Sequence, residues 1–489
     1  MAKRTSIRKN FIMNSILTMS SFIFPIITFP YVSRILGPEN YGRVGMATSL
    51  ISYFAMFAQL GIPTYGIRAC AKVRDDKEAL TRTVQELLGI NLITSAISYA
   101  VFFLAILFVP RLREDRLLYI IVSVTILFKC IGMEWLYKGL ERYVYITIRS
   151  IAFKLIAFAA LFLLVHSKED YVIYGAISVF AASASGILNF INARKIISFT
   201  PIHGLNYRQH LRAVGVFFAM ACATTVYTHL DTLMLGFITT NTDVGYYNAA
   251  VRVKTILVSI VTSLGAVLLP RASYYLEHGE EEAFRRITRK ALNFIAIAAT
   301  PLAVYFMLYA REGIGFLSGS AYEGAVLPMQ IIMPTLFLIG MTNIMGIQIL
   351  VPLGEEKVVL KSEIAGAVTD FVLNMILIPK FHSAGAAVGT LVAELVVLIW
   401  QYAALRGRLR DAIREIKWGS ILGAILAGAA VSVWMKWVVR PENEWMCLLV
   451  LFVTAILFFG CYALILTLRK EPLVLEMEDT ALRKVHIRK

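Results

Sequence analysis

The chain has 489 residues, of which 58% are hydrophobic and only 16% are charged, and its mean hydropathy is +0.69. Soluble domains carry about a quarter charged residues and are less than half apolar, so this composition argues against a soluble enzyme. In a soluble protein a net charge of +16 would suggest nucleic-acid binding. In a membrane protein it indicates basic loops that face the cytoplasm and anionic lipid, so no nucleic acid is expected as a partner.

Apolar runs long enough to cross a bilayer, ~20 residues each, recur along the whole chain. The predicted fold class is therefore an all-α polytopic membrane protein with 14 transmembrane helices. In chain order we predict spans at about 11–33, 44–65, 86–109, 117–137, 143–165, 171–193, 213–238, 245–269, 291–310, 326–351, 358–379, 384–405, 418–438 and 445–468. The first run is too long for a signal peptide and has no small-residue cleavage site, so we expect it to remain as the first span.

The distribution of Lys and Arg predicts the orientation. With the N-terminus inside, most of them fall on the cytoplasmic side, in groups such as Arg68, Lys72, Arg74, Lys77 and Arg82, or Arg406, Arg408, Arg410, Arg414 and Lys417. This asymmetry follows the positive-inside rule and places both termini in the cytoplasm. The five cysteines form no CxxC pair and are expected to be small buried thiols.

Three matches between the halves of the chain indicate an internal repeat. Leu36-Gly37 recurs as Leu235-Gly236 at an offset of 199 residues, and Pro63 recurs as Pro270 at 207. The loop that starts at Glu78 recurs from Glu282 at 204. We therefore predict two six-helix lobes, residues 1–206 and 207–409, with two extra spans and a cytoplasmic tail in 410–489. Parallel repeats of this kind enclose a central cleft, which suits alternating access by rocking lobes.

Ionisable residues inside spans are costly and are candidates for function. The predicted substrate-binding residues are Arg34, Lys129, Arg149, Lys154 and Arg252. Buried cations need an anion, which is either a substrate or a protein carboxylate, and structural pairing with snorkelling remains the alternative. Arg252 and Lys254 are two residues apart on a helix and point to opposite sides, so at most one of them faces the cleft.

The second lobe carries most of the intramembrane acids. The predicted coupling-ion residues are Asp231, Asp370, Asn374, Thr390 and Glu394. Asp370 and Asn374 are four residues apart and share a helix face, as do Thr390 and Glu394. Such oxygen ligands suit Na⁺, and a buried carboxylate could equally carry a proton, whereas plain interhelical hydrogen bonding is the alternative. Beyond a possible Na⁺ or H⁺ no cofactor or metal is expected. No catalytic motif is present, so we do not expect an enzyme.

Arg34 and Asp231 lie at similar places in the two lobes, since each precedes a Leu-Gly pair at the outer end of the lobe's first span. They carry opposite charge. We therefore predict that they approach one another when the outer gate closes. Snorkelling of Arg34 to the outer headgroups is the competing interpretation.

Five stretches resemble the polysaccharide-biosynthesis flippases, which are related to drug/toxin antiporters and lipid II flippases. They are FPYVSRILGPENYG (29–42), WLYKGLERY (135–143), LDTLMLG with GYYNAAVRV (230–253), QILVPLGEEKVVLKSEIAGAV (348–368) and IPKFHSAGAAVGTLVAE (378–394). The resemblance implies a fourteen-helix, two-lobe fold in the bacterial cytoplasmic membrane. It also implies movement of an undecaprenyl-pyrophosphate-linked oligosaccharide from the inner to the outer leaflet, with membrane lipids and a polymerase of the same pathway as partners. A cation-coupled multidrug exporter is the alternative function.

Overall fold

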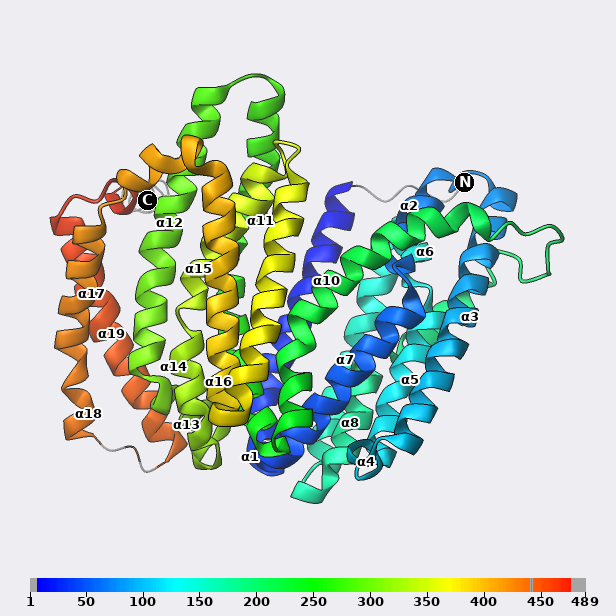
Figure 1. The fold of residues 1–489 in the computed structure, drawn as a ribbon, viewed down its shortest axis with the longest axis horizontal. Helices are drawn as coiled ribbons and strands as arrows, with labels where there is room; N and C mark the ends of the chain where they lie inside the picture. Colours follow the sequence, from blue (N-terminus) through cyan, green and yellow to red (C-terminus); the bar gives the residue numbers. More distant parts are fainter. Residues whose placement is uncertain (1–6, 440, 442, 476–489) are drawn as a thin grey trace, which may run out of the picture. The chain divides into compact units, whose positions relative to one another are not determined.

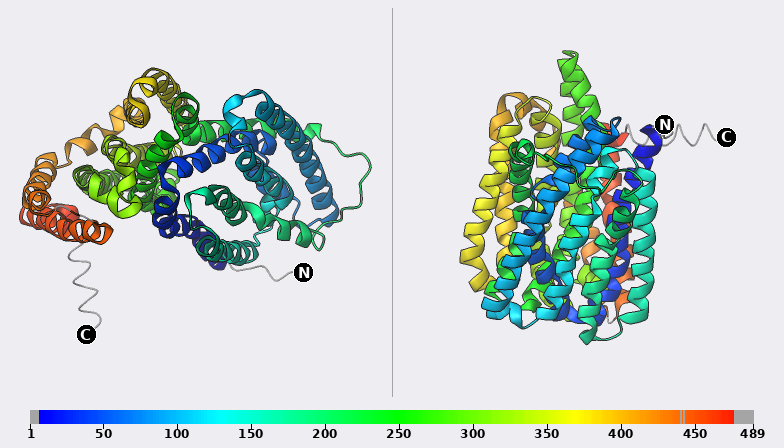
Figure 2. Two further views of the ribbon diagram at one scale, coloured as in Figure 1. Left: turned by 90° about the horizontal axis from the view of Figure 1, so that it is seen from below. Right: turned by 90° about the vertical axis from the view of Figure 1, so that its right-hand side faces the viewer.

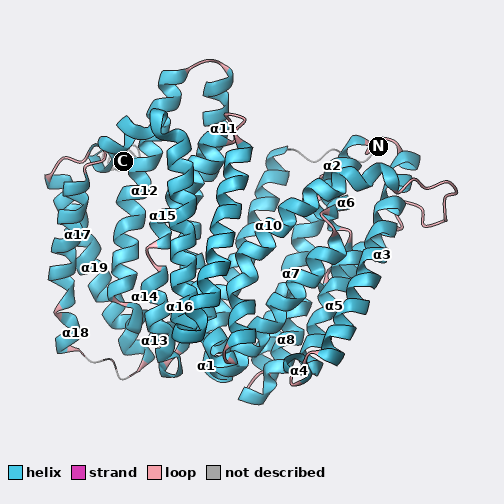
Figure 3. Ribbon diagram, viewed as in Figure 1, coloured by secondary structure: helices cyan, strands magenta, loops and turns pink. Residues whose placement is uncertain are grey.

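The structure is a computed structural model that describes residues 7–439, 441 and 443–475, with the backbone alone for 7, 8, 11, 22, 264–273 and 277. All regular secondary structure in these residues is helical (Figures 1 and 3). The contacts divide the chain into unit 1, Met1–Gly245, and unit 2, Tyr246–Lys489. The lobe boundary between residues 206 and 207 stays a prediction. Both chain ends, residues 1–6 and 476–489, whose cytoplasmic location the sequence predicts, lie outside the described residues.

Unit 1 is built from helices that cover the predicted spans, with two differences. The helix predicted at 86–109 begins nine residues earlier, at Lys77, and a turn at Leu60 and Gly61 interrupts the span predicted at 44–65. The elements of unit 1 are α1 (Ile7–Gln59), α2 (Ile62–Lys72), α3 (Lys77–Phe108), α4 (Pro110–Arg113), α5 (Arg116–Gly132), α6 (Glu134–Gly139), α7 (Tyr143–Leu164), η1 (Lys168–Asp170), α8 (Tyr171–Val179), the π-helix η2 (Phe180–Ala184), α9 (Gly186–Ala193) and α10 (Arg208–Ile238). Helix α11 (Asn241–Glu277) begins in unit 1 and continues into unit 2.

Unit 2 continues the same pattern. Its elements are α12 (Glu281–Leu308), α13 (Ala310–Ser318), η3 (Ser320–Ala325), α14 (Val326–Ile332), α15 (Thr335–Asn343), the π-helix η4 (Ile344–Leu350), α16 (Glu356–Arg414), α17 (Trp418–Val433), α18 (Met435–Val438) and α19 (Glu444–Leu468). Helices α17 and α19 run side by side in every view (Figures 1 and 2) and pack closely, because a Cβ at Gly428 would lie 2.7 Å from the Phe458 carbonyl oxygen.

Within the described residues, ten helical runs are long and apolar enough to cross a membrane, or up to eleven with one bent pair. That pair, Ser320–Ile332 and Thr335–Leu350, meets at 45°. Helices α1 and α16 each contain an internal break, at Gly37 (φ 71°) and at His382 (φ 52°) respectively. Both breaks fall where the sequence predicts a loop between two spans. The chain is thus a multi-pass helical membrane protein, and the number fourteen stays a prediction.

The break in α16 turns the chain back on itself. On one side of the hairpin, Gln401 Nε2 donates a hydrogen bond to Ser362 Oγ at 3.1 Å. Gly366 faces the Val397 side chain, because a Cβ added to the glycine would lie 2.6 Å from Val397 Cγ2. The residue numbers of both pairs add up to the same value, as they must in two antiparallel helices. The two halves of α16 therefore correspond to the separate spans predicted at 358–379 and 384–405.

Large apolar side chains cover the outside of the helices. Phe108 is 76% exposed, Leu163 is 73% exposed and Trp437 is 79% exposed. Soluble proteins seldom leave extended surfaces of this kind in water, whereas lipid chains cover them at no cost. The surface therefore fits the bilayer location that the composition predicts.

Segments related by the predicted repeat contact one another inside unit 1. A Cβ at Gly42 would lie 1.8 Å from the Asn241 carbonyl oxygen, and one at Gly245 would lie 1.9 Å from the Pro38 carbonyl oxygen. Arg111 also reaches this point, since its Nη2 donates to Asn241 Oδ1 at 3.2 Å. Gly42, which follows Tyr41, and Gly245, which precedes Tyr246, are therefore places where two backbones meet without side chains between them.

We predict that Gly42→Ala destabilises the protein. The new methyl group would overlap a backbone carbonyl, and overpacking of this kind costs about 1–3 kcal/mol. The matched control is Gly215→Ala on α10, where nothing lies within 4 Å of an added Cβ. Thermal unfolding of the purified protein in detergent should show a lower midpoint for Gly42→Ala only. Equal midpoints for the two variants would contradict the backbone contact.

Candidate functional site

The predicted fourth span, 117–137, is a broken helix in unit 1. Helix α5 ends at Gly132, α6 begins at Glu134, and Met133 between them has a left-handed conformation (φ 38°, ψ 42°). Asn189 of α9 donates from Nδ2 to the Gly132 carbonyl oxygen at 2.7 Å. A side chain from a neighbouring helix thus takes the place of the interrupted backbone bond, which is how membrane proteins tolerate irregular backbone. Sequence reasoning gave no indication of this break.

Charged residues gather at this break. Lys129 lies in the last turn of α5 and Glu134 in the first turn of α6, where the helix dipoles favour a cation and an anion respectively. The Glu134 charge acts on Lys129, Arg149 and Lys154. Its ion pair is with Lys138, whose Nζ lies 2.9 Å from Oε1. We call these five residues the basic cluster, and in it four cations share one carboxylate.

Arg149 is the most enclosed cation of the basic cluster. Its side chain is buried at 6% exposure, and in the described residues its Nε and Nη1 have no hydrogen-bond partner. The guanidinium carbon lies 5.8 Å from the centre of the Tyr145 ring, a cation–π distance. The Tyr145 hydroxyl in turn donates to the Leu188 carbonyl oxygen at 3.1 Å. Two guanidinium nitrogens therefore remain available to an anion.

Lys154 lies on another face of α7, against the first half of α1. Its Nζ donates to Ser20 Oγ and Ser21 Oγ, each at 2.9 Å. Seven residues earlier, Thr147 Oγ1 donates to the Met13 carbonyl oxygen at 3.0 Å, which fixes this face of α7 on α1. The Lys129 side chain is exposed, and its charge acts on His229 of α10. The structure thus brings three of the predicted cations to one region of unit 1.

Arg34 and Arg252 lie elsewhere. Arg34 is fourteen residues after Ser20 on α1, about 21 Å along the helix from the Lys154 contact, and its side chain is exposed. Asp231 is buried on α10, which packs against α1. The ion pair between Arg34 and Asp231 stays a prediction. Arg252 lies on α11 in unit 2 and is partly buried, and its role in substrate binding also stays a prediction.

Unit 2 brings four of the predicted coupling-ion residues onto the α16 hairpin. Asp370 and Asn374 are buried, and both point at Gly389 on the opposite half of the hairpin. A Cβ at residue 389 would lie 2.4 Å from Asn374 Oδ1 and 2.9 Å from Asp370 Oδ1. The glycine therefore makes room for two oxygen atoms that come from one helix face, as the spacing of four predicts.

Thr390 follows this glycine and joins a second helix to the group. Its Oγ1 lies 2.9 Å from the Tyr247 hydroxyl of α11 and donates to the Ala386 carbonyl oxygen at 3.1 Å. Glu394 is buried one turn further along α16, whereas Asp231 belongs to unit 1. No group of three or more His, Cys, Asp or Glu side chains in the described part of the chain is placed to hold a metal ion. Any cation here would depend on amide and hydroxyl oxygens as well.

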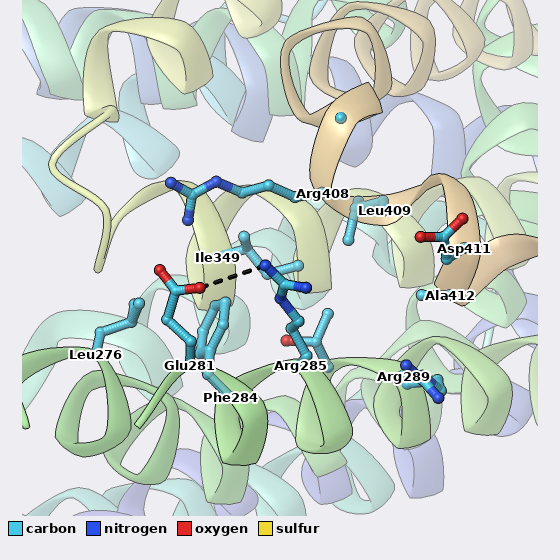
Figure 4. Close-up of a pocket in the computed structure, with 12 residues that line it drawn as sticks. Leu276, Glu281, Phe284, Arg285, Arg289, Ile349, Arg408, Leu409, Asp411 and Ala412 are labelled. Carbon is cyan, nitrogen blue, oxygen red and sulfur yellow. Dashed lines mark hydrogen bonds and ion pairs between the residues drawn. The ribbon is translucent and has the colours of Figure 1, made fainter. Parts of the chain in front are cut away.

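Unit 2 also contains a pocket of about 200 Å³ that none of the predicted site residues lines (Figure 4). It is enclosed by the end of α11, the start of α12, η4 and the end of α16. Arg285 donates to Glu281 at 3.3 Å, and Arg289 pairs with Glu415 at 2.8 Å. The Arg408 side chain extends over the Glu281–Arg285 pair in Figure 4. Two of its three arginines are thus neutralised, which sets this pocket apart from the basic cluster.

Comparison with known proteins identifies the family. A model of the family described as "Polysaccharide biosynthesis protein" matches residues 7–276, which include residues 7–245 of unit 1 and therefore the basic cluster. This match extends over more than half of the chain. The protein belongs to the polysaccharide biosynthesis family. The resemblance seen in the sequence motifs is thereby confirmed.

Relatives of this polysaccharide biosynthesis protein carry the names of transporters. A protein of Escherichia coli (strain K12) named as an O-antigen transporter is 26% identical over 396 residues, which are 81% of this chain and 95% of the relative. A protein of Haloferax volcanii named as a low-salt glycan biosynthesis flippase is 24% identical over 275 residues, 55% of this chain and 56% of the relative. One of these relatives is thus named as a transporter and the other as a flippase.

A solved structure shares the fold of this family member. It is the lipid II flippase MurJ in an inward closed conformation, with a TM-score of 0.71, 14% identity, and coverage of 93% of this chain and 99% of MurJ. At this identity the likeness concerns the fold alone. It confirms the fold relationship that the sequence resemblance implies.

Sequence reasoning missed the polar partners of the cations in this polysaccharide biosynthesis protein. Ser20 and Ser21 are hydroxyl residues in an apolar span, 134 and 133 residues before Lys154, and the sequence does not connect them. Asn189 is one of two asparagines in the predicted sixth span. A polar residue in an apolar span is a usable signal, since it must find a partner inside the protein.

We predict that the double variant Ser20→Ala, Ser21→Ala destabilises the protein. It removes both acceptors of the Lys154 ammonium, and hydrogen bonds to a charged group contribute about 1.5–3 kcal/mol each. Thr18→Ala is the control, because the Thr18 hydroxyl donates only to its own helix, at the Asn14 carbonyl oxygen. Denaturant unfolding followed by tryptophan fluorescence measures the effect. Equal stability of the double variant and the control would show that Lys154 does not depend on α1.

Proposed function

We propose that the protein moves an undecaprenyl-pyrophosphate-linked oligosaccharide repeat unit from the inner to the outer leaflet of the bacterial cytoplasmic membrane, by alternating access. The observation that carries the proposal is the basic cluster, in which four cations share Glu134 and the buried Arg149 has two nitrogens without partners. The names of the family relatives support the same function.

A pyrophosphate would supply the negative charge that the basic cluster lacks. It offers several oxygens that accept charge-assisted hydrogen bonds, and an arginine binds phosphate in a bidentate way with its planar fork. Leaving guanidinium donors buried and unsatisfied costs about 1–3 kcal/mol in stability for each group. An anionic ligand that enters the site removes this cost, so the free protein is preorganised to bind it.

The membrane explains why such a site is needed. An unsatisfied polar group in hydrocarbon costs several kcal/mol, so a pyrophosphate with sugars cannot cross a bare bilayer. A polar path through the protein removes this cost while the prenyl tail stays in lipid. The helix break at Met133 supplies polar backbone and two charged side chains at membrane depth, as the discontinuous helices of transporters do.

The same cluster disfavours the alternative of a multidrug exporter for cations, because four like charges repel a cationic substrate. In the proposed reaction the substrate leaves chemically unchanged, so the protein is not an enzyme and needs no cofactor beyond a coupling ion. Membrane lipids surround the tail, and a polymerase of the same pathway takes up the product. Both termini face the cytoplasm in this arrangement.

Arg149→Gln tests the proposal. We expect the variant to bind undecaprenyl pyrophosphate at least tenfold more weakly, because a charge-assisted contact contributes about 1.5–3 kcal/mol and 1.4 kcal/mol is a factor of ten. Native mass spectrometry of the purified protein measures binding. Accumulation of lipid-linked glycan in cells that carry only the variant measures transport.

Arg142→Gln is the matched control, because Arg142 is an exposed arginine at the start of the same helix. It should bind and transport as the parent does. Arg149→Lys should bind more tightly than Arg149→Gln and more weakly than the parent, since it keeps the positive charge but loses the planar guanidinium group. If Arg149→Gln is folded and binds pyrophosphate with the parent affinity, the anion site is not in the basic cluster.

The coupling ion, Na⁺ or H⁺, is proposed to bind at the α16 hairpin. Asp370→Asn removes one negative charge at nearly constant volume and keeps an oxygen over Gly389. We expect the variant to lose the dependence of transport on an imposed Na⁺ or proton gradient, measured in vesicles loaded with lipid-linked substrate. Glu363→Gln, on the same helix two turns before, is the control and should keep the parent dependence. Gradient-independent transport by the parent would remove the coupling proposal and leave the substrate proposal intact.

A further inference from the structure

A buried chain of polar side chains joins α2, α3 and the N-terminal end of α10, all within unit 1. His210 Nε2 of α10 lies 2.8 Å from Glu86 Oε2 of α3, and His210 Nδ1 lies 2.8 Å from the Tyr65 hydroxyl of α2. Glu86 is 0% exposed and His210 is 5% exposed. None of these residues belongs to the basic cluster or to the α16 hairpin.

Both oxygens of the Glu86 carboxylate accept hydrogen bonds. Oε1 accepts from the Asn206 backbone N–H at 2.8 Å, and Oε2 accepts from Gln209 Nε2 at 2.7 Å in addition to its contact with His210. A buried carboxylate with this many donors is well held, but it keeps a full negative charge while the imidazole is neutral. A proton that binds to this group of side chains would therefore change the net charge of the group.

The imidazole can hold a second proton without losing a hydrogen bond. When it is neutral, Nε2–H donates to Glu86 and Nδ1 accepts from the Tyr65 hydroxyl. When it is protonated, both nitrogens donate, and the Tyr65 hydroxyl rotates so that its oxygen accepts. The proton comes from water, and the charge of the pair changes from −1 to zero. Histidine is the side chain that most often changes its charge between pH 5 and 8.

Charged groups reach the surroundings of the pair from each of the three helices. On α3, Arg82 lies one turn before Glu86 and donates to the Gly204 carbonyl oxygen at 3.2 Å. On α10, Gln209 contacts Glu86, and the exposed Arg208 and Arg212 lie two residues to either side of His210, while α2 supplies Tyr65. The charge of Arg68, also on α2, acts on Tyr65. Removing a net buried charge is favourable, because an uncompensated charge is expensive in a medium of low polarity. Protonation should therefore favour the arrangement in which the three helices are together.

The same three helices touch tightly next to the pair. A Cβ at Gly61, between α1 and α2, would lie 2.4 Å from the Phe218 backbone nitrogen of α10. The Tyr207 ring lies over Gly89 of α3, where a Cβ would meet it at 2.7 Å. The N-terminal end of α10 is thus seated closely on the turn before α2 and on α3, and the alternative arrangement would be one in which this end is detached from them. A change in charge at His210 acts on an equilibrium between two arrangements.

We propose that Glu86 and His210 form a proton-binding site, and that the bound proton holds the N-terminal end of α10 on α2 and α3. The ligand is a proton from the aqueous phase. The inference uses no property of the transported substrate, and it is separate from the coupling ion proposed at the α16 hairpin.

Amide hydrogen exchange of the purified protein without substrate tests this proposal. Protection factors of residues 211–217, corrected for the intrinsic effect of pH on exchange, are compared at pH 6 and pH 8. We expect at least fivefold higher protection at pH 6 in the parent. The exposed His203 lies in the segment just before α10, and His203→Gln is the matched control that should keep the full difference.

Two variants should remove the pH difference in opposite ways. His210→Gln leaves the Glu86 charge in place at both pH values, so its protection should stay at the level of the parent at pH 8. Glu86→Gln removes the charge, so its protection should stay near the level of the parent at pH 6. The protection of α12, in unit 2, shows whether each variant is folded.

Tyr65→Phe provides a milder change that keeps the ring and removes the acceptor for the imidazolium. It should reduce the pH difference without abolishing it. A parent protein with equal protection at both pH values would overturn the proposal. So would a folded His210→Gln variant that keeps the parent difference. Neither result would bear on the basic cluster, because no lipid-linked substrate is present in the experiment.

Discussion

A polar group that the bilayer surrounds must find its partner inside the protein, because hydrocarbon offers none. Most of the architecture follows from this constraint. Asn189 satisfies the carbonyl oxygen that the break after Gly132 exposes, Ser20 and Ser21 receive the Lys154 ammonium, and Tyr247 meets Thr390. Against this background Arg149 stands out, since two of its buried nitrogens have no partner in the described residues. Other buried polar atoms of the described residues, such as Arg43 Nε, also lack a partner, but Arg149 has two of them on one cation, and this difference is the reason to consider an anion there.

Regular helices were predictable from the sequence, and interruptions were predictable only in part. The fifth and sixth spans were expected at 143–165 and 171–193, and the structure has helices over Tyr143–Leu164 and from Tyr171 to Ala193. The length and the hydropathy of an apolar run are sufficient to predict helices of this kind. The breaks in α1 and α16 coincide with predicted loops because Gly37 and the segment at His382 interrupt an apolar run. The break at Met133 was not predicted, because its neighbours Gly132 and Glu134 lie inside one long apolar run with no proline or cluster of turn residues.

The candidate site was predictable in its charges but not in its contacts. Spacing of four placed Asp370 and Asn374 on one helix face, and the structure turns both toward Gly389. Arg149 and Lys154 were found because charge in an apolar run is conspicuous. Their partners were not found, because a contact such as that of Lys154 with Ser20 spans 134 residues of sequence. The contact between Glu86 and His210 was not predicted for the same reason, since the two residues are 124 positions apart. Each also lies near the end of a predicted span, where polar residues are common.

The break between α5 and α6 bears on how the protein is made. The left-handed backbone of Met133 costs about 1–2 kcal/mol for a residue with a side chain, and an unsatisfied Gly132 carbonyl costs more in lipid. Asn189 satisfies this carbonyl, and its backbone oxygen also accepts from the Tyr137 hydroxyl of α6 at 2.6 Å. This residue is synthesised 57 positions after Gly132. The side chain that satisfies the break is therefore available only after the sixth span has been synthesised.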